Sequence, residues 1–151
     1  MKKIIKIALQ MDPLENLDLR GDTTFIIGLE AIKRGFEVFF YSPSDLIFKN
    51  NYVYANTKML DLELKNGKEI FSYSKEKVLK LSSLDVILMR QDPPFNMDYI
   101  NNTYILESAA KLGVKVFNDP KTLRDSNEKL AILDYPSLIT NTIVSSSKEI
   151  I

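Results

Sequence analysis

Short apolar runs, each closed by polar residues or proline, recur along this chain and predict buried strands. We expect these strands at residues 4–11, 37–41, 84–89 and 114–117. The run at 84–89 is apolar at five of its six positions, which is typical of a strand buried on both faces in a parallel sheet that helices cover. The hydrophobic pattern therefore predicts an α/β fold with a mostly parallel sheet.

Between these strands, apolar residues recur at helical spacing. Asp22 is a good N-cap for a helix over residues 23–34, and Asn96 can cap a second helix over residues 97–112. We expect Tyr104, on the second helix, to pack in the core rather than to contact a ligand. The first strand, the first helix and the next strand complete a β-α-β unit, which is parallel and almost always right-handed.

The middle of the chain departs from this pattern. Residues 46–48 and 52–54 flank two asparagines and predict a hairpin, because asparagine tolerates positive φ. Residues 60–64 alternate between leucine and acidic residues, which predicts a half-buried strand. We expect residues 70–73 to continue this meander and residues 74–81 to form a short helix. The segment is thus predicted to be an antiparallel excursion at the sheet edge, with a structural or subunit-contact role.

The last thirty residues predict further elements. We expect a turn and a helix from residue 123 to about Tyr135, a strand starting at 142–144, and a new helix after the serines at 145–147. Because an element is only beginning when the chain reaches Ile151, we expect the protein to be unfinished at that point.

The composition is that of one globular domain. The 151 residues are 45% hydrophobic and 26% charged, and 20 basic residues balance 20 acidic ones. This balance gives no field that would attract nucleic acid or an anionic membrane. No stretch approaches the roughly 18 apolar residues of a membrane span, and Lys6 interrupts the apolar run that a signal peptide would need. We therefore expect a cytoplasmic protein.

The residue types that the chain lacks exclude several kinds of chemistry. The absence of cysteine excludes disulfides, thiolate nucleophiles and zinc–sulfur sites. The absence of histidine excludes the usual hydrolytic triads and zinc chemistry. None of the five glycines falls in a G-x-G-x-x-G or Walker pattern, which argues against a classical dinucleotide fold or a P-loop enzyme.

The residues that follow the strand at 84–89 are the first candidates for a binding site. Arg90 lies at the carboxyl end of that strand, Asp92 follows, and two prolines prevent further strand pairing. Ligands of open α/β sheets bind outside the carboxyl ends of the strands. A guanidinium there can hold a carboxylate or a phosphate through paired hydrogen bonds. It can also form a surface ion pair with Asp92, and the residues alone leave both interpretations open.

Three stretches carry longer motifs. They are Met11-Asp12-Pro13 with the loop into Asp22-Thr23-Thr24-Phe25, the stretch Leu84 to Phe95 with its Met-Arg-x-Asp-Pro-Pro-Phe pattern, and the stretch Asn118 to Leu130. In this order and spacing, they resemble prokaryotic glutathione synthetase, a family of ATP-grasp ligases, over essentially the whole chain. One departure is Gln91, where the family pattern often has a basic residue.

The resemblance implies a fold and a domain organisation. The family begins with a Rossmann-like pre-ATP-grasp domain, with helices on both faces of its sheet, which we expect at residues 1–122 with an antiparallel hairpin insertion. Residues 123–151 would begin an ATP-grasp domain. The glycine-rich flap, a second ATP-binding lysine and the magnesium carboxylates would lie beyond this chain. We expect the chain alone to be inactive, and the full-length protein to be a homo-oligomer.

The resemblance also implies a reaction. Enzymes of this family join γ-glutamylcysteine to glycine with ATP and Mg²⁺ or Mn²⁺. The dipeptide carboxylate takes the γ-phosphoryl group of ATP, and the glycine amine attacks the acyl phosphate. Such chemistry needs no histidine or cysteine, because lysine, arginine and the metal ion position the reactants and neutralise their charge.

By position in the motifs, the resemblance assigns three site residues. Arg90 would bind the peptide substrate through a carboxylate. Lys129 matches a lysine that contacts ATP phosphate, although without the motif a solvated helix lysine would be expected. Asp12 would either orient the ligand amine or cap its own loop. We assign no catalytic residue and no metal ligand to this chain.

Two other functions stay open at this point. One is a non-catalytic α/β binding or assembly module. The other is an ATP-grasp ligase with a different acceptor, because the acceptor contacts would mostly lie outside these residues.

Overall fold

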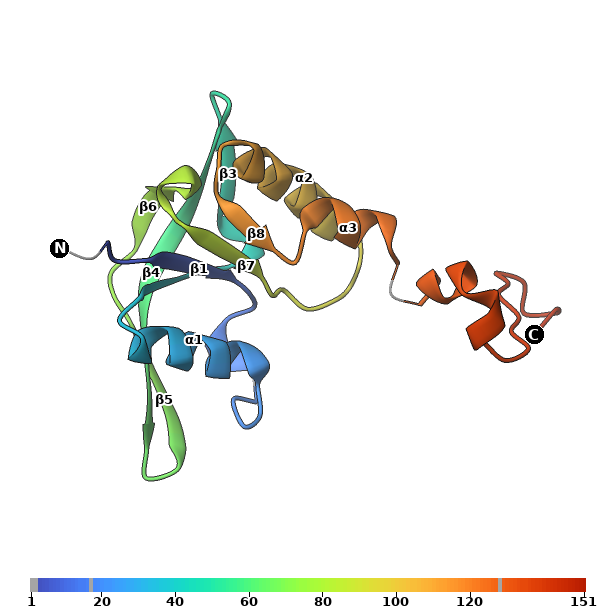
Figure 1. Ribbon diagram of the computed structural model, residues 1–151, viewed down its shortest axis with the longest axis horizontal. Coiled ribbons are helices and arrows are strands. Elements are labelled where there is room, and N and C mark those ends of the chain that lie inside the picture. The colour runs from blue at the N-terminus through green and yellow to red at the C-terminus, as the bar shows by residue number, and fades with distance from the viewer. Residues whose placement is uncertain (1–2, 17, 128) are drawn as a thin grey trace.

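A computed structural model of the chain describes residues 3–16, 18–127 and 129–151. Within them, one sheet forms the core, with the strand order β3-β4-β2-β1-β7-β8 (Figure 1). The central strands are parallel and comprise β2 (Glu37–Tyr41), β1 (Lys6–Gln10), β7 (Val86–Met89) and β8 (Lys115–Phe117). The predicted α/β fold with a parallel core is confirmed.

Two helices cover the two faces of this sheet. Helix α1 (Thr23–Lys33) packs on one face and helix α2 (Met97–Lys111) on the other, close to their predicted bounds. The predicted caps are confirmed, because the Asp22 carboxylate accepts a hydrogen bond from the Phe25 N–H at 2.7 Å and the Asn96 side chain accepts one from the Tyr99 N–H at 3.0 Å. Each cap satisfies a backbone donor that the helix leaves unpaired.

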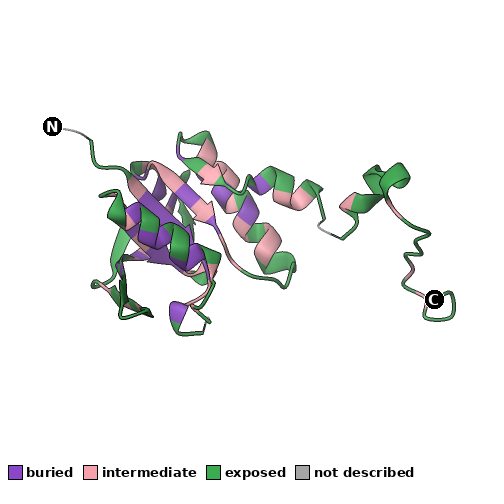
Figure 2. Cartoon of the chain, turned by 60° about the horizontal axis from the view of Figure 1, so that its bottom comes forward, coloured by how far each residue is buried: buried purple, intermediate pink, exposed green. Residues whose placement is uncertain are grey.

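Alternation along β1 divides the core into two hydrophobic clusters. Ile7 and Leu9 belong to the cluster beneath α1, whereas Ala8 belongs to the cluster beneath α2. Successive side chains of a strand point to opposite faces, so the middle of a strand between two helical layers, here residues 7–9, is apolar on both faces. Figure 2 shows the result as buried strands enclosed by helices that are buried on one side only.

The middle segment forms the antiparallel part of the sheet. Its long strand β4 (Tyr52–Lys65) pairs with β2, β3 (Leu46–Lys49), β5 (Lys68–Tyr73) and β6 (Lys77–Lys80). The predicted hairpin is confirmed, with Asn50 and Asn51 at φ values of 51° and 62°. The meander predicted for residues 60–73 is also confirmed, and β4 merges two strands that the sequence suggested separately.

The short helix predicted for residues 74–81 is wrong. Residues 77–80 instead form β6 and pair with residues 54–57 of β4. Ser74 does not cap a helix, because its hydroxyl accepts a hydrogen bond from the Met59 N–H of β4 at 2.8 Å. The unpaired edge of β4 therefore decides the conformation of this segment.

The structure after β8 also differs from the prediction. The helix expected from residue 123 to Tyr135 is wrong, because helix α3 (Pro120–Asp125) ends at Ser126 and two 3-10 turns follow at Ala131–Asp134 and Pro136–Leu138. In the described part after residue 139, neither the predicted strand nor the predicted helix forms. These residues extend away from the sheet and are mostly exposed (Figures 1 and 2), so they have no neighbouring strand to pair with.

The prediction that Tyr104 is a core residue is wrong. Its side chain is 56% exposed on the outer surface of α2. The guanidinium carbon of Arg124 lies 3.9 Å from the centre of its ring. One face of the ring is thus covered by a cation from α3 rather than by the core.

Candidate functional site

The carboxyl ends of β1 and β7 lie side by side and carry the candidate residues. The Arg90 N–H donates to the Gln10 carbonyl oxygen at 2.7 Å, which extends the pairing of the two strands by one residue. Beyond this point the two strands continue into separate loops. Asp12 lies in the loop after β1, and Asp92 lies in the loop after β7. This is the edge at which open α/β sheets bind their ligands.

The Arg90 side chain is held at the start of helix α1. Its Nε donates to Thr24 Oγ1 at 3.1 Å, and its Nη2 donates to Thr23 Oγ1 at 2.7 Å. Among the described residues it forms no ion pair with Asp92 or with any other carboxylate. The structure therefore does not contain the surface ion pair between Arg90 and Asp92 that the sequence left open.

This arrangement leaves part of the guanidinium available. An arginine side chain carries five N–H donors, and the two threonine hydroxyls take two of them. Within the described part of the chain, three donors have no hydrogen-bond partner, namely both N–H groups of Nη1 and the second N–H group of Nη2. The guanidinium is thus oriented in advance and can still bind an anion through two donors, as carboxylates and phosphates require.

Asp12 connects the two loops. Its Oδ2 accepts a hydrogen bond from the Asp92 N–H at 2.9 Å. It therefore caps the loop that follows β7 rather than its own loop. A carboxylate in this position also places negative charge at the same sheet edge as the Arg90 guanidinium.

Gln91 contacts both the sheet edge and a neighbouring pocket. Its Oε1 accepts a hydrogen bond from the Gln10 side chain at 2.6 Å, while the Gln10 Oε1 is buried and has no partner among the described groups. The amide of Gln91 also lines a pocket of about 460 Å³ between the β7 loop and α3. The neutral Gln91 side chain therefore brings no charge to this part of the pocket.

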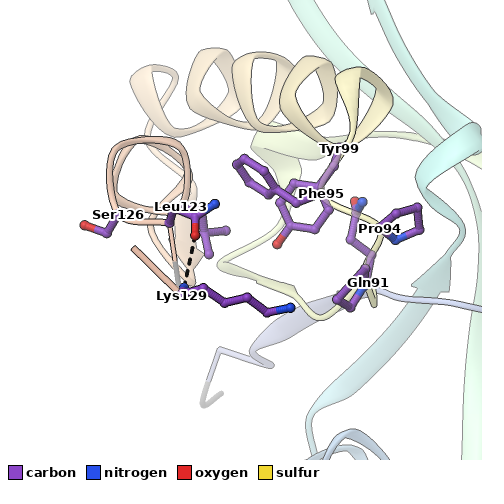
Figure 3. A pocket seen from close by; sticks show the side chains of 9 residues that line it. Gln91, Pro94, Phe95, Tyr99, Leu123, Ser126 and Lys129 are labelled. Atoms are coloured by element: carbon purple, nitrogen blue, oxygen red, sulfur yellow. Dashed lines mark hydrogen bonds between the residues drawn. The ribbon is translucent and has the colours of Figure 1, made fainter. Parts of the chain in front are cut away.

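The pocket combines apolar walls with one positive charge. Its lining residues are Gln91, Pro93, Pro94, Phe95, Tyr99, Leu123, Ser126, Asn127 and Lys129. The rings of Phe95 and Tyr99 lie 5.0 Å apart in a tilted arrangement. The Lys129 side chain extends from the far wall toward Gln91 (Figure 3). Among these described lining residues, Lys129 alone carries a charge, which favours an anionic ligand.

The structure thus brings Arg90 and Asp12 to one edge and places Lys129 on the opposite side of an adjoining pocket. The sequence analysis missed Gln10 and the role of the two threonines at the start of α1. Gln10 could have been noticed as a polar residue that directly follows the apolar residues 7–9 of the first strand. The threonines lie 66 and 67 residues from Arg90, and no local pattern indicates such a contact.

The described residues contain no cluster of carboxylates that could hold a metal ion without other ligands. No group of three or more carboxylates lies close enough together to hold a metal ion in residues 3–16, 18–127 and 129–151. Magnesium in ATP-using enzymes is usually held by one or two carboxylates together with phosphate oxygens, and we assign none of these residues to it. In the same residues, no helix is both long and apolar enough to cross a membrane.

Comparison with known families decides the classification. A model of the family described as prokaryotic glutathione synthetase, N-terminal domain, matches residues 5–124, which is most of the chain. The chain belongs to this family. The match includes α1, β7, the loop with Arg90 and α2, so the sheet edge described above lies inside the family's domain.

Individual glutathione synthetases are similar over nearly the whole chain. The protein of Buchnera aphidicola from Acyrthosiphon pisum is 43% identical over 145 residues, which cover 95% of this chain and 45% of that protein. The protein of Escherichia coli K12 is 41% identical over 145 residues, covering 96% and 46%. The protein of Vibrio parahaemolyticus is 40% identical over 147 residues, covering 97% and 46%. The chain thus spans slightly less than half the length of these relatives.

Proposed function

We propose that this chain is the N-terminal, peptide-binding portion of a glutathione synthetase-type ligase, which joins γ-glutamylcysteine to glycine at the expense of ATP. The family membership and the names of the relatives support this assignment. Because the chain covers less than half of those relatives, the proposal places the remaining binding and catalytic groups outside these residues.

The observation that supports the proposal most strongly is that Arg90 has no carboxylate partner among the described residues. A buried or partly buried cation with no carboxylate partner is costly unless a ligand neutralises it. Arg90 is half-buried and is held by two neutral threonine hydroxyls. We assign its three remaining donors to a carboxylate of the peptide substrate.

Asp12 complements this assignment. The γ-glutamyl end of the substrate carries an ammonium and a carboxylate on the same carbon, and a cation and an anion that follow the ends of two adjacent strands match such a group. Asp12 uses one carboxylate oxygen for the Asp92 N–H, and we assign the other to the substrate ammonium.

We assign Lys129 to the phosphates of ATP. The basis is the position of its side chain in the pocket, where it points from α3's side toward the β7 loop (Figure 3). A lysine ammonium is a compact charge that suits phosphate oxygens. In this arrangement the phosphates would face the loop that follows β7, across the pocket from Lys129.

The proposal also divides the chain into two functional parts. Residues 1–122 would form the peptide-binding domain, and residues 123–151 would begin the ATP-grasp domain that binds the nucleotide. The described residues contain no cluster of three or more carboxylates, and the proposal gives the metal ion no ligand here. We further propose that the complete protein acts in the cytoplasm as a homo-oligomer.

The test is the Arg90→Ala substitution in the complete polypeptide that carries this chain. Loss of a charge-assisted contact worth roughly 1.5–3 kcal/mol should raise the KM for γ-glutamylcysteine by about 10- to 100-fold. The KM for ATP should change little, because Lys129 lies across the pocket. Initial-rate kinetics with each substrate varied in turn measures both constants.

The matched control is Arg34→Ala. Arg34 pairs with Glu30 on the exposed surface of α1 at 2.7 Å, so its removal should leave both constants unchanged. A peptide KM that stays at the wild-type value in Arg90→Ala would remove Arg90 from the binding site.

A further inference from the structure

Arg124 connects α3 to α2 through three different contacts. Its Nη1 donates to Thr103 Oγ1 at 3.0 Å, its Nη2 forms an ion pair with Glu107, and its guanidinium lies 3.9 Å from the centre of the Tyr104 ring. The side chain is only 12% exposed. We call Arg124 with these three α2 residues the arginine clamp.

The partners of Arg124 are themselves fixed on α2. The Thr103 hydroxyl is fully buried and donates to the Ile100 carbonyl oxygen at 2.6 Å. The second carboxylate oxygen of Glu107 is 3.0 Å from the Lys111 ammonium. The clamp therefore attaches the short helix α3 to a rigid surface that spans more than one turn of α2.

The clamp lies directly before the lysine that enters the pocket. Helix α3 ends at Ser126. The next residue, Asn127, accepts hydrogen bonds on its Oδ1 from the Lys129 and Leu130 N–H groups at 3.0 and 3.1 Å. The Lys129 backbone is thus linked to α2 through a capped turn and α3. An error in the orientation of α3 would move the Lys129 side chain across the pocket.

We propose that Arg124 is a positioning residue, which sets the location of Lys129 opposite the β7 loop by fixing α3 on α2. This inference rests on the proposed function for the part that concerns ATP. Its geometric part concerns the position of the turn at residues 129–134 and does not depend on any ligand.

Arginine is required for this role, and lysine is not equivalent. A planar guanidinium can stack on Tyr104 and donate to Thr103 and Glu107 at the same time, whereas an ammonium offers one point charge on a flexible stem. Arg124→Lys should therefore keep the ion pair with Glu107 and lose the orientation that the other two contacts provide.

The geometric part can be tested in this chain, which contains no native cysteine. Spin labels on Asn101→Cys and Leu133→Cys, both exposed positions, report the distance between α2 and the turn after α3. The native clamp should give one narrow distance distribution. Arg124→Ala should broaden it, Arg124→Lys should broaden it partly, and Arg34→Ala should leave it unchanged.

The functional part is tested in the complete polypeptide. Because small displacements of a binding group can cost one to two orders of magnitude, Arg124→Ala should raise the KM for ATP by about tenfold. The KM for γ-glutamylcysteine should change less than the KM for ATP. If Arg124→Ala does not fold, Glu107→Gln removes one clamp contact at constant volume and should show the same pattern more weakly.

Different results overturn different claims. An unchanged label distance in Arg124→Ala overturns the positioning role, as does an equal rise of both KM values, which would indicate a general loss of structure. An unchanged KM for ATP in Lys129→Ala overturns the proposed role of Lys129. In that case a broadened distance in Arg124→Ala would still support the geometric part of the inference.

Discussion

At the scale of single residues, Glu107 links pH to the contact between α2 and α3. Its carboxylate accepts hydrogen bonds from Arg124 and Lys111, and these cations hold the pKa of Glu107 below its usual value of 4.5. A carboxyl group whose pKa is lower in the folded state than in the unfolded state stabilises the fold at pH values above the unfolded pKa. That contribution is lost as the pH falls through the lowered value.

We therefore predict how Glu107→Gln changes the pH dependence of stability. At pH 7 the variant should be less stable than the wild type, because the ion pair with Arg124 is lost. The difference should shrink as the pH falls below about 4.5, the unfolded value, and vanish once Glu107 is protonated in the folded wild type. Thermal unfolding between pH 7 and pH 3 measures it. Glu63→Gln, on the exposed surface of β4, is the control, and a difference independent of pH would contradict the explanation.

At the scale of elements, the close approach of α1 to β4 depends on Gly28. A Cβ added there would lie 2.7 Å from Leu62 Cδ1 and 3.4 Å from Leu9 Cδ1. Both leucines are buried in the cluster beneath α1. The missing side chain therefore allows the helix to contact two strands directly, which places the start of α1, and with it Thr23 and Thr24, beside Arg90.

Gly28→Val should destabilise the protein by about 1–3 kcal/mol, because two extra methyl groups and a β-branched carbon overfill this contact. Chemical unfolding with a common slope measures the loss. Ile26→Val on the exposed side of the same helix is the matched control and should change the stability by less than about 0.5 kcal/mol. Equal effects of the two substitutions would show that the contact at Gly28 is not tight.

Elements with strong local signals were predicted from the sequence. Helices α1 and α2 have capping side chains at their first turns, and each parallel strand carries a short apolar run, so local pattern and tertiary structure agree. The segments 74–81 and 123–135 were predicted incorrectly for a different reason. Their hydrophobic patterns are short and do not fix the local conformation. Pairing with β4 makes part of the first segment a strand. In the second segment the helix ends at Ser126, and the Asn127 side chain caps the turn that follows.

The candidate site was predicted in part. The motifs indicate Arg90, Asp12 and Lys129, and their roles remain proposals. The contacts that orient Arg90 and α3 could not be predicted, because they join residues far apart in the chain, as Arg124 and Thr103 are. Tyr104 illustrates the same limit. Its aromatic ring suggested a core position, but its partner is a cation from another helix.

At the scale of the whole molecule, the sheet has an open edge. Strand β3 is the last strand in the order and exposes Ile47 and Phe48, at 41% and 53%. An exposed apolar edge strand is a surface on which another chain can pair. This edge is our candidate for contact between identical subunits in the proposed homo-oligomer.

Phe48→Lys should therefore weaken the assembly, because a charge at a strand edge opposes pairing with a second edge. Size-exclusion chromatography with light scattering should detect smaller species than the wild type forms. Ile27→Lys, on the exposed side of α1, is the matched control and should leave the assembly unchanged. These measurements use the complete polypeptide, for which the oligomer is proposed. A monomeric wild type would contradict the proposed oligomer, and an unchanged assembly in Phe48→Lys would place the contact elsewhere.

The most direct test of the proposed function is the assay of glutathione formation by the complete polypeptide that carries this chain. With γ-glutamylcysteine, glycine and ATP, we predict that glutathione, ADP and phosphate form in equal amounts. We also predict that residues 1–151 alone form none. A product only with another acceptor would indicate a different ligase. If the peptide binds but no product forms under any of these conditions, the ligase assignment is contradicted and a binding module is the better description.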